Sequence, residues 1–274
     1  MLEQERDEAV RIARAAGDIL MEIYATDFAV EFKGVRDPVT KADKLANAYI
    51  VAELKKLFPE DGIVAEETAD QSDAIKGGRC WFVDPLDGTK EFIKKNGEFA
   101  VMLGLSVDGE SRMGVVFQPA KDKLYAGIVD GGAWLEEKGE RRDLNVSTEA
   151  TPANLKLVAS RSHRSESVDA IVKELGITQE TQSGSVGLKV GLIAEQTADI
   201  YLHFSDRASA WDACGPEAIL RAAGGRFTRL DGKLYDYRRE DVRNDGGIFA
   251  CNSAAYDAVA PTAHDIGRKA KLVE

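Results

Sequence analysis

The chain has 274 residues, of which 44% are hydrophobic and 30% are charged, a composition typical of a folded globular protein. Its formal net charge of −11 argues against nucleic-acid polymers and anionic membranes as partners, because like charges repel. The length suits one large domain or two modest ones in close contact.

Signals for export, and for metal binding through sulfur or nitrogen, are weak. The first eight residues are too charged for a secretory signal, and no apolar run approaches the length that spans a membrane. Cys80, Cys214 and Cys251 are far apart and lack metal-ligand spacing. With only three histidines, a zinc site or a Ser-His-Asp triad has little material. We therefore expect reduced, mostly buried cysteines and a cytoplasmic location.

Two helices and a short strand are expected in the first 65 residues. Apolar residues from Ala9 to Ile23 recur at helical spacing, which predicts an amphipathic opening helix. A second helix is expected from about Thr40 to Phe58, before a proline and an Asp-Gly pair. Its expected inward-facing residues are Leu45, Tyr49, Ile50, Leu54 and Leu57. A strand over residues 63–65 then leads to Glu66.

Asp84 and Asp87 follow an apolar strand that begins near Trp81, and a proline and a leucine separate them. On a stiffened turn, two carboxylates at this spacing can converge on a hard cation. The glycine and threonine that come next could open a helix, whose free N–H groups bind phosphate. The alternative is that Asp-Pro and Asp-Gly are ordinary turn dipeptides.

The remaining pattern divides the chain into two parts. Three or four strands are expected between Phe99 and Leu135, and Asp-Gly turns between them indicate an antiparallel sheet. After about residue 150, strands and helices alternate, which is typical of an α/β arrangement. The expected elements there are strands over 155–159 and 200–202, helices over 168–175 and 188–194, and a helix that follows Trp211-Asp212 with Pro216 near its first turn. The sequence predicts an α+β part, residues 1–150, and an α/β part, residues 151–274.

Acidic residues lie where several expected elements begin or end. They are Asp43, Glu66, the Asp84/Asp87 pair and Asp212. Each alone fits an ordinary cap, turn residue or solvated charge, and aspartate is common at helix starts. A cluster of unpaired carboxylates, however, strains a fold unless cations neutralise it. Taken together, these residues predict a metal-dependent phosphate site.

Ordered motifs give the chain a strong resemblance to the inositol monophosphatase superfamily. They are Val39–Asp43, Ala65–Thr68, Asp84–Thr89 and Trp211–Gly215. The resemblance covers nearly the whole chain and implies a layered αβαβα sandwich. It also implies a lithium-sensitive, magnesium-dependent phosphatase that acts on a small-molecule phosphate ester.

A second set of segments is more similar to the 3′(2′),5′-bisphosphate nucleotidases, whose substrate is 3′-phosphoadenosine 5′-phosphate. These segments are Lys90–Phe92, Asn96–Phe99, Ser160–His163, and Gly184-Ser185 followed by Leu188-Lys189. The favoured activity is therefore removal of the 3′-phosphate to give AMP and phosphate. The alternatives are an inositol monophosphatase or other small sugar-phosphate phosphatase, and a catalytically silent phosphate or metal sensor. A homodimer is left open.

The resemblance also implies a role for each matching residue. One Mg²⁺ would be held by Glu66, Asp84 and the Leu86 carbonyl, and a second by Asp84, Asp87 and Asp212. Two or more ions would then be bound per site, at the roughly 3.5–4 Å separation of a two-metal clamp. Catalysis would use Thr89, backed by Asp43, on the attacking water that the Glu66 cation binds.

Substrate contacts are expected from two regions. The Gly88 and Thr89 amides would cradle the phosphate. The candidates for the distal part of the substrate are Ser185, Lys189, His203 and Arg207. The alternative interpretation of Lys189 is that it is a solvated surface lysine without a role in binding. His203 stands where eukaryotic nucleotidases of the family carry an arginine, and Arg207 is the candidate substitute.

Overall fold

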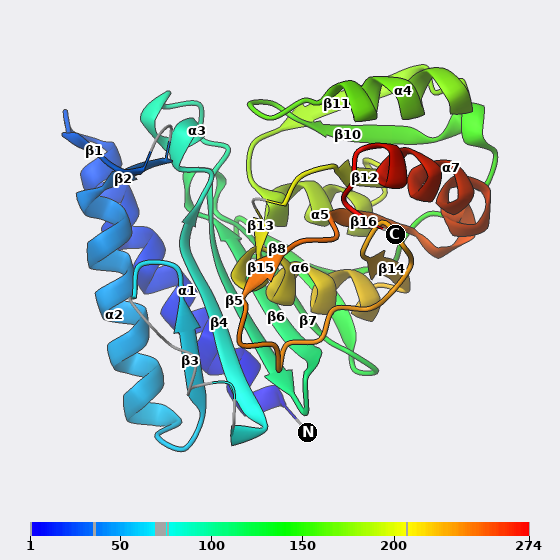
Figure 1. Ribbon diagram of the computed structural model, residues 1–274. Helices are drawn as coiled ribbons and strands as arrows, with labels where there is room; N and C mark the ends of the chain where they lie inside the picture. The colour runs from blue at the N-terminus through cyan, green and yellow to red at the C-terminus, as the bar shows by residue number, and fades with distance from the viewer. Residues whose placement is uncertain (1, 35–36, 69–74, 76, 207, 274) are drawn as a thin grey trace.

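The protein is built of five layers, in the order helix, sheet, helix, sheet, helix (Figure 1). The computed structural model describes residues 2–34, 37–68, 75, 77–206 and 208–273. The helices of the three helical layers are α1 (Glu3–Tyr24) with α2 (Lys41–Leu57), α5 (Val186–Ala194) with α6 (Ala210–Ala222), and α4 (Glu166–Leu175) with α7 (Tyr256–Lys269). The αβαβα sandwich implied by the resemblance is confirmed.

A seven-stranded sheet forms the second layer, between the α1/α2 pair and the α5/α6 pair. In spatial order its strands are β3 (Gly62–Ala65), β4 (Arg79–Asp87), β5 (Ala100–Val107), β6 (Glu110–Gln118), β7 (Lys123–Ile128), β8 (Gly132–Glu137) and β9 (Glu140–Leu144). Strands β3 and β4 are parallel, and the others pair antiparallel. Three or four strands were expected between residues 99 and 135, and the structure has four there, β5 to β8, whereas β9 was not expected.

A five-stranded sheet forms the fourth layer. In spatial order its strands are β11 (Gln179–Ser183), β10 (Lys156–Ser160), β12 (Ile200–His203), β16 (Ile248–Asn252) and β14 (Gly225–Thr228). Strand β10 pairs parallel with both neighbours, as an α/β part requires. Strand β16 instead pairs antiparallel with β12 and β14, so the sheet is mixed. The chain passes from one sheet to the other between Leu144 and Lys156.

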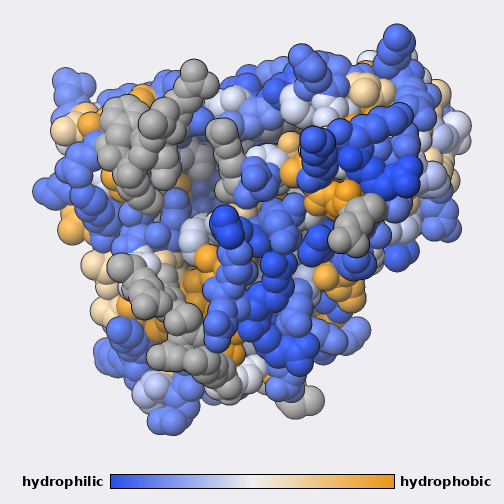
Figure 2. Space-filling model, in the orientation of Figure 1, coloured by the Kyte–Doolittle hydropathy of each residue, from blue (hydrophilic) through white to orange (hydrophobic). Residues whose placement is uncertain are grey.

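Two short antiparallel strand pairs and a one-turn helix lie outside the two large sheets. They are β1 (Val30–Gly34) with β2 (Asp37–Thr40), β13 (Ala208–Ser209) with β15 (Arg243–Asn244), and α3 (Thr89–Ile93). Within the described ranges no helix is both long and apolar enough to cross a membrane. The face seen in Figure 2 is largely hydrophilic, and its apolar side chains form small, separate patches.

Helix α2 is rotated relative to the sequence-based expectation. Leu45 and Leu57 are 43% and 36% exposed, so their predicted inward orientation was wrong. The buried stripe contains Ala42, Ala46, Ile50 and Leu54. The rotation follows from the first turn, where buried Asp43 accepts hydrogen bonds from the backbone and side chain of Thr40 and so must face the interior. Small alanines then allow α2 to lie close to α1.

Glycines allow α6 to contact the seven-stranded sheet backbone to backbone. A Cβ added to Gly114 would lie 2.0 Å from the Gly215 carbonyl oxygen, and one added to Gly104 would lie 2.4 Å from the Gly215 nitrogen. Any side chain at these positions would push the helix off β5 and β6. The close approach places the first turn of α6 beside the end of β4. Because α6 begins at Ala210, Pro216 lies in its second turn, and the expectation that it lay near the first turn was wrong.

Candidate active site

A bulge at the end of β4 places Asp84 and Asp87 on the same face of the sheet. Asp84 pairs with Met102 and Asp87 with Ala100, so three steps along β4 oppose two along β5. In a regular strand, residues three apart point to opposite faces, and one extra residue restores the same face. The expected turn is therefore a bulge within the strand. The Leu86 N–H donates to Asp84 Oδ1 at 2.9 Å and fixes this carboxylate.

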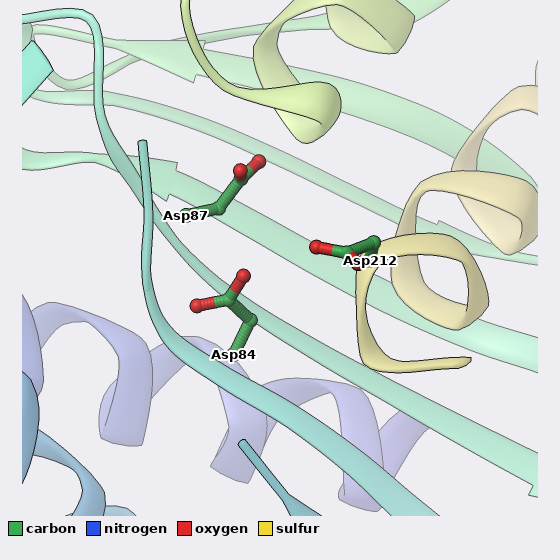
Figure 3. A group of neighbouring side chains, drawn as sticks. All are labelled: Asp84, Asp87 and Asp212. Carbon is green, nitrogen blue, oxygen red and sulfur yellow. The ribbon is translucent and has the colours of Figure 1, made fainter. Parts of the chain in front are cut away.

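Asp212 reaches the same space from the third layer. It lies in the first turn of α6, where the Ser209 N–H donates to Asp212 Oδ2 at 2.6 Å. The carboxylates of Asp84, Asp87 and Asp212 point toward one another in Figure 3. One oxygen from each lies within 4.8 Å of the others. Residues 84, 87 and 212 are thus brought together as the sequence predicted, although two different elements supply them.

Burial makes this cluster costly without a cation. The pKa values of Asp84 and Asp212 are raised well above 3.8, first by burial and then by the neighbouring carboxylates. The pKa of Asp87 is raised by burial, against the opposing effect of the Lys189 charge. Oxygen ligands of this kind suit a hard divalent ion such as Mg²⁺. The residues present therefore fit the metal that the resemblance implies.

Glu66 and the Leu86 carbonyl lie beside the cluster. The Glu66 N–H donates to the Val83 carbonyl at 3.1 Å, which holds Glu66 next to β4. Its charge raises the pKa of both Asp84 and Asp212, although its carboxylate is outside the 4.8 Å group. The Leu86 carbonyl accepts the Thr89 hydroxyl at 3.2 Å.

Thr89 and Asp43 form a second functional pair at the start of α3. The Thr89 hydroxyl lies 3.3 Å from Asp43 Oδ1, while Asp43 Oδ2 accepts two bonds from Thr40 at 2.7 Å each. Asp43 therefore caps α2 and orients Thr89 with its two separate oxygens. Gly88, at φ +94°, precedes Thr89, and a Cβ there would lie 2.9 Å from the Glu98 carbonyl oxygen. Only glycine fits this left-handed, crowded position.

The predicted distal contacts have mixed outcomes. Lys189 is 1% exposed, so the alternative of a solvated surface lysine was wrong. Its ammonium lies over the Tyr201 ring and donates to the carbonyls of Gly184 and Ser185, and burial lowers its pKa to about 8. His203 ends β12, where burial lowers its pKa to about 4. Arg207 lies outside the described residues.

Sequence reasoning did not connect Lys90 with His163. Lys90 Nζ lies 2.7 Å from His163 Nε2, joining α3 to the loop after β10. A few residues away, Lys94 Nζ donates to Ser162 Oγ at 2.9 Å, and Ser162 in turn donates to buried Glu91. Both segments had been singled out only for their resemblance to nucleotidases. Their meeting required a contact between residues 73 positions apart, for which the sequence held no local signal.

One stability prediction follows from the aspartate cluster. In the metal-free protein the raised pKa values mean that folding takes up protons above pH 3.8, the usual aspartate value. The associated stability is present below that value and is lost as pH rises through the raised folded pKa values. We expect the melting temperature in chelator to fall as the pH rises above the ordinary aspartate pKa, and saturating Mg²⁺ to reduce this fall. Thermal melts in matched buffers measure it, and a flat metal-free profile would contradict the assignment.

Known proteins resemble the chain over nearly its whole length. Residues 1–268 match the model of the inositol monophosphatase family. The 3′(2′),5′-bisphosphate nucleotidase CysQ of Salmonella typhimurium is 38% identical over 244 residues, which are 88% of this chain and 97% of that protein. The IMPase structure from Thermotoga maritima superposes with a TM-score of 0.82 at 25% identity, covering 97% and 99% of the two chains. The structure of CysQ from Bacteroides thetaiotaomicron superposes with a TM-score of 0.75 at 29% identity, covering 91% of this chain and 97% of that one.

Proposed function

The chain belongs to the inositol monophosphatase family, and from that premise we propose that it is a magnesium-dependent phosphatase of 3′-phosphoadenosine 5′-phosphate. The observation that carries the metal-dependent part is the cluster of Asp84, Asp87 and Asp212, whose carboxylates converge within 4.8 Å. The substrate is proposed from the relatives named as bisphosphate nucleotidases, at 37–38% identity. The buried, unpaired cysteines suit a reducing compartment, and we place the protein in the cytoplasm.

The proposed mechanism assigns one task to each residue of the site. Asp84, Asp87 and Asp212, with Glu66 and the Leu86 carbonyl, would hold Mg²⁺. Bound Mg²⁺ would neutralise phosphoryl charge and lower the pKa of the attacking water. The Thr89 hydroxyl is placed to accept a proton from that water while passing its own to Asp43 Oδ1, 3.3 Å away. The amides of Gly88 and Thr89 would hold the phosphate.

A nucleotide bisphosphate carries a second phosphate, and a cation must meet it in a chain of net charge −11. Sequence reasoning gave this role to Lys189, but its ammonium already serves two backbone carbonyls and is 1% exposed. Arg161 is paired with Glu98 through two bonds of 2.6 and 2.7 Å. Lys90 has the His163 ring as its hydrogen-bond partner, at 2.7 Å. Lys90 directly follows Thr89 in the chain, and its ammonium is bonded to a histidine ring rather than to a carboxylate or backbone carbonyl. For these reasons we assign the second phosphate to Lys90 and His163.

A small substrate panel tests this proposal. With Mg²⁺ present, wild type is expected to release phosphate faster from 3′-phosphoadenosine 5′-phosphate than from inositol monophosphate or 2′-AMP. Lys90→Met should lower kcat/KM for the bisphosphate by about tenfold, the scale of one charge-assisted hydrogen bond, and spare both monophosphates. Lys94→Met, four residues away at the C-cap of α3, is the matched control and should change kcat/KM for none of the three substrates.

Each other result selects a different function. A wild-type preference for inositol monophosphate would replace the nucleotidase by the monophosphatase. Equal losses on all three substrates in Lys90→Met would place Lys90 at the scissile phosphate instead. No release from any substrate would favour the silent sensor.

A further inference from the structure

The first turn of α5 faces Asp87 from across the site. Ser185, the N-cap residue of this helix, donates its hydroxyl proton to Asp87 Oδ2, and the Gly187 N–H donates to the same oxygen at 3.1 Å. Two donors from the second half of the chain therefore hold one carboxylate at the end of β4. The partners are 98 and 100 positions apart, so only the packed fold brings them together.

The Ser185 hydroxyl has little capacity left for a substrate. It accepts the Leu188 N–H at 3.1 Å as the helix cap, and its single proton goes to Asp87. The side chain is 0% exposed. A substrate group would have to displace an existing bond to reach it.

The surrounding backbone holds Ser185 in this orientation. The Lys189 ammonium donates to the Ser185 carbonyl at 2.9 Å, and the Ser185 N–H donates to the Glu98 carbonyl at 3.3 Å. A Cβ at Gly184 would lie 2.4 Å from the same Glu98 oxygen, so the segment is pressed against the loop after α3. These hydrogen bonds and close contacts hold Ser185 in one orientation. A residue that orients a metal ligand needs this kind of support.

We infer that Ser185 is a positioning residue that fixes Asp87 for the divalent cation, and that it does not contact the substrate. The inference rests on the proposed function, because it takes Asp87 as a metal ligand. Because Asp87 Oδ2 accepts from both Ser185 and Gly187, the bonds from α5 set the direction in which the Asp87 carboxylate faces. Partners of this kind typically change metal affinity or activity by about 10- to 100-fold when removed.

Ser185→Ala tests the inference through metal binding measured without substrate. The Mg²⁺ dissociation constant from titration calorimetry is expected to rise by about 10- to 100-fold. At saturating Mg²⁺ the substrate KM should stay near its wild-type value. Ser185→Thr keeps the hydroxyl and should restore Mg²⁺ affinity.

Ser165→Ala is the matched control, because Ser165 caps α4 in the outer layer by accepting the Val168 N–H. Both alanine variants lose a cap and should melt somewhat below wild type, but only Ser185→Ala should bind Mg²⁺ more weakly. Wild-type Mg²⁺ affinity in Ser185→Ala, or a raised KM alone, would overturn the inference and restore the substrate role. A wild-type protein that binds no Mg²⁺ would overturn the proposed function together with it.

Discussion

Removing divalent cations is expected to abolish phosphate release, and added Mg²⁺ is expected to restore it. The reason is the set of buried carboxylates at Asp84, Asp87 and Asp212. Burial raises all three pKa values, the neighbouring carboxylates raise those of Asp84 and Asp212 further, and a cation offsets the cost of keeping these groups charged. The group contains no histidine or cysteine, so an oxygen-seeking ion is preferred over zinc. Phosphate release after dialysis against chelator, followed by titration with Mg²⁺, measures the effect.

Thermal melts provide an independent measurement of the same metal site. At 100 times its dissociation constant, Mg²⁺ should stabilise the folded protein by about 2.7 kcal/mol. Lithium is expected to inhibit turnover, as the family resemblance implies. Full activity in excess chelator would exclude the metal mechanism, whatever the substrate proves to be.

Asp84→Asn is expected to lower turnover by more than about 100-fold, beyond the loss usual for groups that only support a ligand. The amide keeps the volume of the carboxylate and can still accept the Leu86 N–H, which lies 2.9 Å from Asp84 Oδ1. It removes the charge that would bind the cation. Since Asp84 is 3% exposed and surrounded by Glu66, Asp87 and Asp212, losing its charge should leave the metal-free protein at least as stable as wild type.

The combination of lost activity and retained stability separates ligand loss from misfolding. Melts with and without Mg²⁺ should show a smaller metal-induced shift in Asp84→Asn than in wild type. Asp130→Asn is the control for net charge, because the Asp130 side chain is 81% exposed and its positive φ of 66° suits asparagine. Equal metal-induced shifts in Asp84→Asn and wild type would mean that Asp84 is not a ligand.

Local patterns in the sequence were enough to predict much of the fold. Helical spacing of apolar residues predicted α1, and Asp108-Gly109, both with positive φ, predicted the β5–β6 hairpin. In contrast, β14 and β16 were missed, and so was α7 with Pro261 inside it. Strand β16 is buried throughout between two neighbours, so its residues show no alternation that would mark a strand.

Residue chemistry and chain order were determined by the sequence alone. Asp84, Asp87 and Asp212 could be singled out because carboxylates at element ends suit a hard cation and because the motifs resemble a known family. Their geometry was decided by long-range packing. The β4 bulge places Asp87 on the same face of the sheet as Asp84. Close glycine contacts bring α6, and with it Asp212, against that face.

The contacts of the residues around these carboxylates depended on the tertiary structure even more. The sequence predicted Ser185 and Lys189 as substrate contacts. Only the structure shows that Ser185 donates to Asp87 and that the buried Lys189 ammonium donates to the Ser185 carbonyl. The pairing of Lys90 with His163 was likewise absent from any local pattern. The sequence determines which side chains can form the site and, through local propensity, which helices and strands carry them. Which atom each group meets is set by contacts between layers, because hydrogen bonds and close packing act between neighbours in space.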